Sequence, residues 1–174
     1  SGPGPMGLMC LKLLLAQGLK TIVAGTAADL QRLELARKLG AAVVVKANEQ
    51  DLDAVVKGET EGLGVDLAFE CAGAGASAAN CLNALRPLGC YTQVGHFGKD
   101  VTVPFDRVAF KQLRVHGSVG YNAATWQRAL GILGSGAVKL GDLITHRLPL
   151  DEWQKGFAAF ENKSALKVLL QPGP

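Results

Sequence analysis

The chain opens with three glycines at the spacing G-x-G-x-x-G, namely Gly2, Gly4 and Gly7. Glycines at this spacing permit a tight turn and let the backbone approach a phosphate closely, and the N–H groups at the start of a following helix attract anions. Pro5 suits the first helical turn, where its missing N–H is not needed, and Met6 begins an apolar run. The pattern predicts a backbone cradle for a pyrophosphate; an ordinary glycine turn before a core helix is the alternative.

A dinucleotide bound in this way also needs a partner for its adenosine ribose at the end of the second strand, where a carboxylate selects NAD. Gly25 and Thr26 occupy that place. Thr26 could donate a hydrogen bond to a 2′-phosphate, and Arg32 or Lys46 could supply positive charge. These residue types therefore favour NADP as the cofactor, and NAD is the alternative. Asp29 comes slightly late for this position and is expected to cap the next helix.

Strands and helices are expected to alternate along most of the chain, because short β-branched runs alternate with amphipathic segments between Gly and Pro residues. This alternation predicts an α/β fold of the Rossmann type, a doubly wound parallel sheet with helices on both faces. Helices are expected at 6–17, 29–39, 49–61, 77–85, 106–111, 123–133 and 151–162, and strands at 21–24, 41–45, 65–71, 90–94, 101–103, 113–119, 144–148 and 166–170.

The glycine loop should follow a strand, yet only Ser1 precedes it. In a doubly wound sheet that strand lies at the centre, and its absence would leave an unpaired gap. We therefore expect the sheet to lack its first central strand and the chain to be a fragment of a larger protein.

The composition is that of a globular protein, with 48% hydrophobic and 19% charged residues among 174. This length predicts a single domain over 1–174. A net charge of +3, spread along the chain, argues against a nucleic-acid partner, and no apolar run suggests a membrane. The four cysteines lack C-x-x-C spacing and are expected to be free thiols in a reducing cytoplasm. They are Cys10, Cys71, Cys81 and Cys90.

Longer segments resemble the cofactor-binding domain of zinc-containing medium-chain dehydrogenases, above all the sorbitol and threonine dehydrogenases. Together they cover nearly the whole chain in the family's order. The segments are GPGPMGLM at 2–9, RLELARKLGA at 32–41, GVDLAFECAGA at 64–74, LRPLGCYTQVG at 85–95, KQLRVHGSVGY at 111–121 and LITHRLPLDEWQKGF at 143–157.

The resemblance implies that the turns after successive strands bind NAD or NADP, at the carboxyl edge where open α/β sheets bind ligands. The glycine loop matches the pyrophosphate loop, and Gly25 and Thr26 match the adenosine-ribose position. Ordinary turn chemistry is the alternative for each glycine taken alone. The other matching positions are Cys71, Ala72 and Gly73 on the adenosine side, and Val94, Gly95, His96, Ser118, Val119 and Gly120 near the nicotinamide.

The resemblance also implies an oxidoreductase that moves a hydride between an alcohol or polyol and NAD(P), with a catalytic zinc on a separate domain. No His-Glu pair and no four-cysteine lobe occurs in the sequence, so we assign no catalytic or metal-binding residue and expect zinc only in the parent enzyme. The fragment alone is expected to bind dinucleotide without turnover. A non-catalytic nucleotide-binding or sensing module is the alternative, and a methyltransferase is disfavoured by the segment at 143–157.

Relatives in this family pair two such domains edge to edge. We therefore expect a homodimer through the edge strand Leu113–Val119, which is apolar enough to be paired. Residues 143–174 are expected to return towards the absent catalytic domain, which would be the second partner of this fragment.

Overall fold

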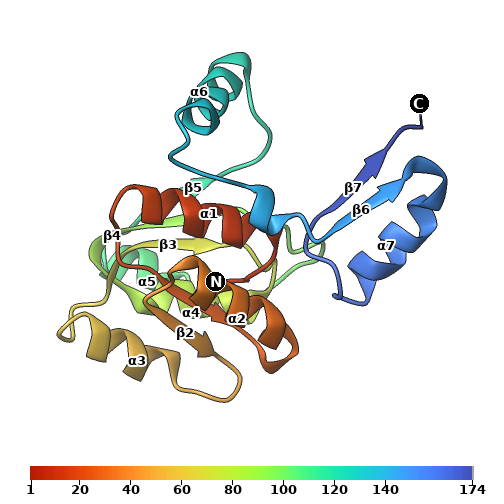
Figure 1. Cartoon of the computed structure of the whole chain (residues 1–174). Helices are drawn as coiled ribbons and strands as arrows, with labels where there is room; N and C mark the ends of the chain where they lie inside the picture. Colours follow the sequence, from red (N-terminus) through yellow and green to blue (C-terminus); the bar gives the residue numbers. More distant parts are fainter. Residues whose placement is uncertain (174) are drawn as a thin grey trace. The chain divides into compact units, whose positions relative to one another are not determined.

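The computed structural model describes residues 1–173 and contains two compact units, 1–127 and 128–174. The prediction of one domain over the whole chain stays a prediction. Within the first unit, α1 and α2 contact each other, as do α3 and α4, and helices cover both faces of the strands (Figure 1). Its elements are α1 Pro5–Ala16, β1 Ile22–Gly25, η1 Ala27–Asp29, α2 Leu30–Leu39, β2 Val43–Lys46, α3 Leu52–Glu59, β3 Val65–Glu70, α4 Gly75–Ala84, β4 Leu85–Gln93, α5 Asp106–Phe110 and β5 Arg114–Gly117.

Local sequence explains where these helices begin and end. Pro5 occupies the first turn of α1, as predicted. Gly40 adopts the left-handed conformation with φ 110° and ends α2, while its N–H satisfies carbonyl groups of the last helical turn. The side chain of Asp51 accepts hydrogen bonds from the N–H groups of Asp53 and Ala54 and so caps α3.

All strand pairs of the first unit are parallel, which confirms the predicted α/β class. β1 pairs with β2, and β4 lies between β3 and β5. The two ladders are separate, and the place between β1 and β3 is where the missing central strand is predicted. The first residues of the chain bridge it: Ser1 N–H donates to the Phe69 carbonyl at 2.8 Å, and Gly2 N–H donates to the Ala24 carbonyl at 2.8 Å.

Two expectations for single elements are wrong. β4 begins at Leu85 and not at 90, because Leu85 pairs with Val65 before an irregularity in the ladder. Leu88 takes a positive φ of 62° in that irregular segment, and regular pairing resumes at Cys90. Residues 101–103 form no strand. Instead, Val103 packs against the buried apolar residues between α4 and the strands β3 and β4.

One buried apolar cluster of the first unit lies between α4 and the strands β3 and β4. It joins small residues on the helix to larger ones from the strands, so that the helix packs closely against the sheet. Its buried members are Ala68, Ala78, Cys81, Leu82, Leu85, Tyr91 and Leu113.

Helix α6, Ala123–Gly134, crosses the boundary between the two units. The second unit contains a parallel pair, β6 His146–Pro149 and β7 Val168–Gln171, with α7 Trp153–Glu161 packed on both strands. It also contains two short 3-10 turns, η2 Gly141–Leu143 and η3 Leu150–Glu152. None of the helices within residues 1–173 combines the length and the apolar character that crossing a bilayer requires.

Candidate functional site

The start of α1 is the first part of the candidate site. Gly4 is the N-cap residue, in an extended conformation with φ −76° and ψ −175°, and its carbonyl accepts from Leu8 N–H at 2.9 Å. In the described part of the chain, no side chain caps this helix. The first N–H groups of a helix have no partner within it and carry partial positive charge. This helix start can therefore hold an anion.

Two of the loop glycines are required by packing, and the third is not. A Cβ on Gly2, where φ is 90°, would lie 2.6 Å from the backbone nitrogen of Ala72, and a Cβ on Gly7 would collide with the Gly2 carbonyl oxygen. A Cβ on Gly4 would meet nothing within 4 Å. The fold thus explains the glycines at 2 and 7, whereas the glycine at 4 leaves open space in front of the helix start.

The turns after β3, β4 and β5 lie beside this loop at the carboxyl ends of the strands. We call this surface the rim; it consists of the glycine loop, Cys71–Gly73, Val94–His96 and Ser118. A Cβ on Gly73 would collide with the His96 carbonyl oxygen, and one on Gly95 would collide with the Gly73 nitrogen. Ser118 N–H donates to the carbonyl of Gln93 at 2.9 Å. Since parallel strands end at the same edge of a sheet, these backbone contacts bring the predicted residues of the three turns together.

At the end of β1, the side-chain ring of Pro3 from the glycine loop packs closely against the strand. A Cβ on Gly25 would lie 2.9 Å from Cδ of Pro3. Thr26 begins the short turn η1, and its N–H and hydroxyl donate to the Asp29 carboxylate at 3.0 and 2.7 Å. Asp29 is the N-cap residue of α2, as expected, but its side chain makes no capping hydrogen bond to that helix, because the carboxylate closes a capping box with Thr26.

The basic residues expected near the ribose position are placed less favourably. Lys46 forms an ion pair with Glu49, and Arg32 lies half-buried in the first turn of α2. Two other predicted residues lie at exposed places: Met6 is 50% exposed on α1, and Val119, beyond β5, is 80% exposed. The structure thus unites the glycine loop with the strand ends but shows no contact that ties Val119 to them.

Glu70 is a site residue that sequence reasoning missed. It is fully buried at the end of β3. Its carboxylate accepts from Ala72 N–H at 2.9 Å, from Gly73 N–H at 3.1 Å and from the Gln93 side-chain amide at 2.7 Å. Burial of a carboxylate is tolerated only when its oxygens are hydrogen-bonded. Glu70 therefore fixes the turn after β3.

The same residue also fixes the turn after β4. The backbone carbonyl of Glu70 accepts from the N–H groups of Val94 and Gly95, both at 2.8 Å, and the Gln93 amide also donates to the Gly95 carbonyl at 2.6 Å. A signal was present in the sequence, since Glu70 is a charged residue at an inward position of the strand Val65–Glu70, two residues after the buried Ala68.

Two thiols meet beside the glycine loop. The Cys71 thiol, after β3, donates a hydrogen bond to Cys10 of α1, which lowers the pKa of Cys10 to about 7 although burial acts in the opposite direction. The same hydrogen bond and burial raise the pKa of Cys71. Burial also raises the pKa of Cys81. All four cysteines are free, as expected. Of Cys10, Cys71 and Cys81, Cys10 is the thiol whose lowered pKa favours the thiolate.

Among residues 1–173, no group of three or more His, Cys, Asp or Glu side chains is placed to hold a metal ion.

Comparison with known proteins agrees with this architecture. A family model described as zinc-binding dehydrogenase matches residues 5–135. The chain is 34% identical over 173 residues to a sorbitol dehydrogenase of Halalkalibacterium halodurans, covering 99% of this chain and 50% of that protein. It is 36% identical over 173 residues to an L-threonine 3-dehydrogenase of Bacillus velezensis, covering 98% and 50%.

Among solved structures, an alcohol dehydrogenase from Thermus sp. ATN1 superposes with a TM-score of 0.89 at 30% identity, covering 99% of this chain and 49% of that one. The match confirms the predicted Rossmann-type fold. The chain spans about half the length of the curated relatives it matches.

Glu70→Gln is expected to reduce the free energy of unfolding by about 1–3 kcal/mol, because one acceptor becomes an amide that faces N–H donors in a buried place. Chemical denaturation monitored by circular dichroism measures this change. Asp100→Asn, at an exposed carboxylate of the same unit, is the matched control and should change stability by less than about 0.5 kcal/mol. Equal stabilities of the two variants would contradict the assigned role.

Cys10 is expected to react with iodoacetamide at pH 7 faster than Cys71 or Cys81, since its pKa is lowered, which favours the thiolate, while theirs are raised. Cys71→Ala removes the hydrogen-bond donor, so the Cys10 rate at pH 7 should fall about tenfold and recover towards pH 10. Peptide mapping by mass spectrometry measures both rates. Cys90→Ala is the control and should leave the profile of Cys10 unchanged; an unchanged profile in Cys71→Ala would refute the coupling.

Proposed function

We propose, since this chain belongs to the zinc-binding dehydrogenase family, that it is the NAD-binding half of a zinc-dependent alcohol or polyol dehydrogenase. The observation that carries the proposal is the open space before Gly4 at an uncapped helix start. Neither backbone strain nor packing requires a glycine there. A pyrophosphate in that space would accept hydrogen bonds from the first N–H groups of α1.

The rim supplies the remaining contacts of the proposed site. The end of β1, at Gly25 and Thr26, would receive the adenosine ribose, and the turn Cys71–Gly73 would lie along the adenosine side. The turns at Val94–His96 and Ser118 would orient the nicotinamide, which supplies the hydride acceptor or donor when bound. Glu70 accepts hydrogen bonds from the backbone of the turn at Cys71–Gly73 and of the turn at Val94–His96. The two turns are thereby fixed, which would preorganise the site for the cofactor.

We further propose NAD, and not NADP, as the preferred cofactor. The hydroxyl of Thr26 is already donated to Asp29, so it does not serve a 2′-phosphate. The Asp29 carboxylate adds negative charge at the end of β1, and Lys46 is paired with Glu49. A 2′-phosphate would meet like charge here, which lowers its affinity. These contacts support NAD against the lean towards NADP that the residue types alone suggested.

The described residues do not fit a zinc site, and we propose that another part of the enzyme holds the metal and the substrate. Residues 143–174 would connect to that catalytic domain, and this chain alone would bind dinucleotide without turnover. A cytoplasmic location is supported by the four free cysteines. A homodimer through the predicted edge Leu113–Val119 is supported by β5, an edge strand whose residues are all exposed.

Gly4→Asp tests the proposed pyrophosphate contact. Aspartate is a good N-cap residue and the backbone at Gly4 is extended, so stability should not fall. Its carboxylate would fill the open space and repel the phosphates, so NAD affinity should fall at least about tenfold. Isothermal titration of the chain with NAD measures the affinity. Gly58→Asp adds the same charge on α3, where a Cβ also meets nothing, and should leave NAD affinity unchanged; equal affinities of both variants would contradict the site.

Asp29→Asn tests the choice of cofactor. The amide oxygen can still accept from Thr26, so the capping box is kept while the charge is lost. The ratio of NADP to NAD affinity should therefore rise about tenfold, measured by parallel titrations with the two cofactors. Asp53→Asn on α3 is the control for loss of one carboxylate. An unchanged ratio in Asp29→Asn would contradict the proposed preference.

A further inference from the structure

Two cysteines from distant parts of the sequence meet in the first unit. Cys10 lies on α1 and Cys71 directly follows β3, yet their thiols share a hydrogen bond. Both are free thiols in this structure. Two thiols in contact can form a disulfide without a large movement of the chain, because the bond requires only that the two sulfur atoms approach further.

The contact depends on the close approach of α1 to the turn after β3. A Cβ on Gly7 would lie 3.6 Å from the Cβ of Cys71, so the helix passes directly beside this cysteine. Cys10 lies three residues after Gly7 and therefore on the same face of the helix, about one turn further along. The glycine brings the helix close, and the next residue on that face carries the second thiol.

Both cysteines are held on fixed backbone. Leu8 and Leu11 of α1 are fully buried, so the helix is anchored on both sides of its cysteine. Ala72 N–H donates to the buried carboxylate of Glu70 at 2.9 Å, so the turn that carries the other cysteine is fixed as well. Groups held in this way react with each other far more readily than the same groups on a mobile chain.

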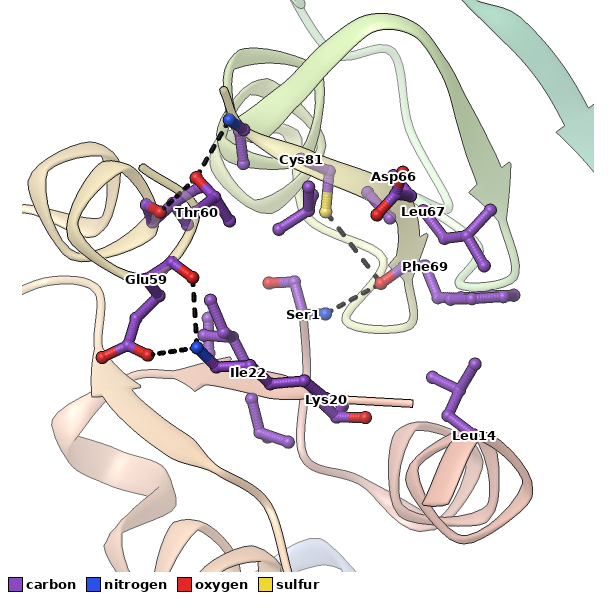
Figure 2. Close-up of a pocket in the computed structure, with 18 of the residues that line it drawn as sticks. Ser1, Leu14, Lys20, Ile22, Glu59, Thr60, Asp66, Leu67, Phe69 and Cys81 are labelled. Atoms are coloured by element: carbon purple, nitrogen blue, oxygen red, sulfur yellow. Dashed lines mark hydrogen bonds and ion pairs between the residues drawn. The ribbon is translucent and has the colours of Figure 1, made fainter. Parts of the chain in front are cut away.

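The other two cysteines are directed elsewhere. Cys81 is buried, and its sulfur lies 3.9 Å from the carbonyl oxygen of Phe69 (Figure 2). Cys90 lies within β4, level with Leu67 and therefore well before the end of β3. Both members of the contacting pair, by contrast, are only partly buried, so a small oxidant can reach them. The fold thus selects one pair among the four cysteines.

The protonation of the pair gives the two thiols different roles. The hydrogen bond from Cys71 lowers the pKa of Cys10 and so favours its thiolate, which is the form that reacts with oxidants. The same hydrogen bond, burial and the negative charge of Cys10 raise the pKa of Cys71. Oxidation of Cys10 removes that charge, and Cys71 then loses its proton more readily. Cys10 is therefore suited to react first and Cys71 to react second.

We propose that Cys10 and Cys71 are a site of reversible thiol oxidation, at which hydrogen peroxide converts the pair into a disulfide. The Cys10 thiolate attacks the peroxide: an S–O bond forms, the O–O bond breaks, and the departing hydroxide takes up a proton to give water. The Cys71 sulfur then attacks the sulfenic acid of Cys10: an S–S bond forms, the S–O bond breaks, and the leaving hydroxide combines with the Cys71 proton as water. The pair loses two electrons, and the peroxide gains them.

The disulfide would join α1 covalently to the turn after β3. Disulfides in a reducing compartment are usually transient and redox-sensing, which agrees with a pair that is in contact but reduced. The proposal concerns thiol chemistry, so it goes beyond cofactor binding and does not depend on it.

The test treats the reduced 174-residue chain with hydrogen peroxide and follows it by mass spectrometry without reductant. The mass should fall by two hydrogen atoms, fragment ions should link Cys10 to Cys71, and dithiothreitol should restore the starting mass. A linkage to Cys81 or Cys90, a linkage between two chains, or the absence of any linkage would overturn the proposal.

Cys71→Ser is the matched variant, because its hydroxyl keeps a hydrogen-bond donor for Cys10 but cannot form a disulfide. Cys10 in this variant should stop at the sulfenic acid, so labelling of Cys10 by dimedone should rise at least about tenfold over the unchanged chain. Cys90→Ser is the control and should form the disulfide as the unchanged chain does. Equal dimedone labelling with and without Cys71, or loss of the disulfide in Cys90→Ser, would overturn the assignment.

Discussion

Close contact between backbone segments at the carboxyl ends of the strands is the constraint on which the site depends. Gly2 lies against Ala72, and Gly73 lies against His96 and Gly95, at distances that leave no room for a Cβ. The glycine loop and the turns of β3 and β4 therefore form one surface made of main chain. Such a surface binds through N–H groups and has little freedom to rearrange, which suits a cofactor held at a fixed place.

One buried carboxylate maintains this arrangement. Glu70 engages the turns after β3 and β4 through both its side chain and its carbonyl. The packing of the strands alone would leave the N–H groups of Ala72 and Gly73 without these carboxylate partners. A charged residue at the end of an apolar strand is thus a structural requirement of the rim, and it acts on the proposed cofactor through the backbone of the two turns.

The sequence predicted features that depend on local pattern. Gly40 and Pro5 marked helix ends, the apolar alternation marked most strands, and the glycine spacing located the uncapped start of α1. It did not predict features that depend on distant partners. The role of Glu70 depends on Gln93 and on the turn N–H groups, the Thr26 hydroxyl is bonded to Asp29, and the start of β4 at Leu85 depends on its pairing with Val65. The sequence also predicted a missing central strand, whereas the bond from Ser1 N–H to the Phe69 carbonyl became visible only in the structure.

The central claim is that the start of α1 binds the pyrophosphate of a dinucleotide, and a crystal structure of the chain grown with NAD tests it most directly. The account predicts diphosphate oxygens within hydrogen-bond distance of the N–H groups of Met6 and Gly7, in the space before Gly4. NAD bound with its diphosphate elsewhere, or a side chain filling that space in the complex, would contradict the account.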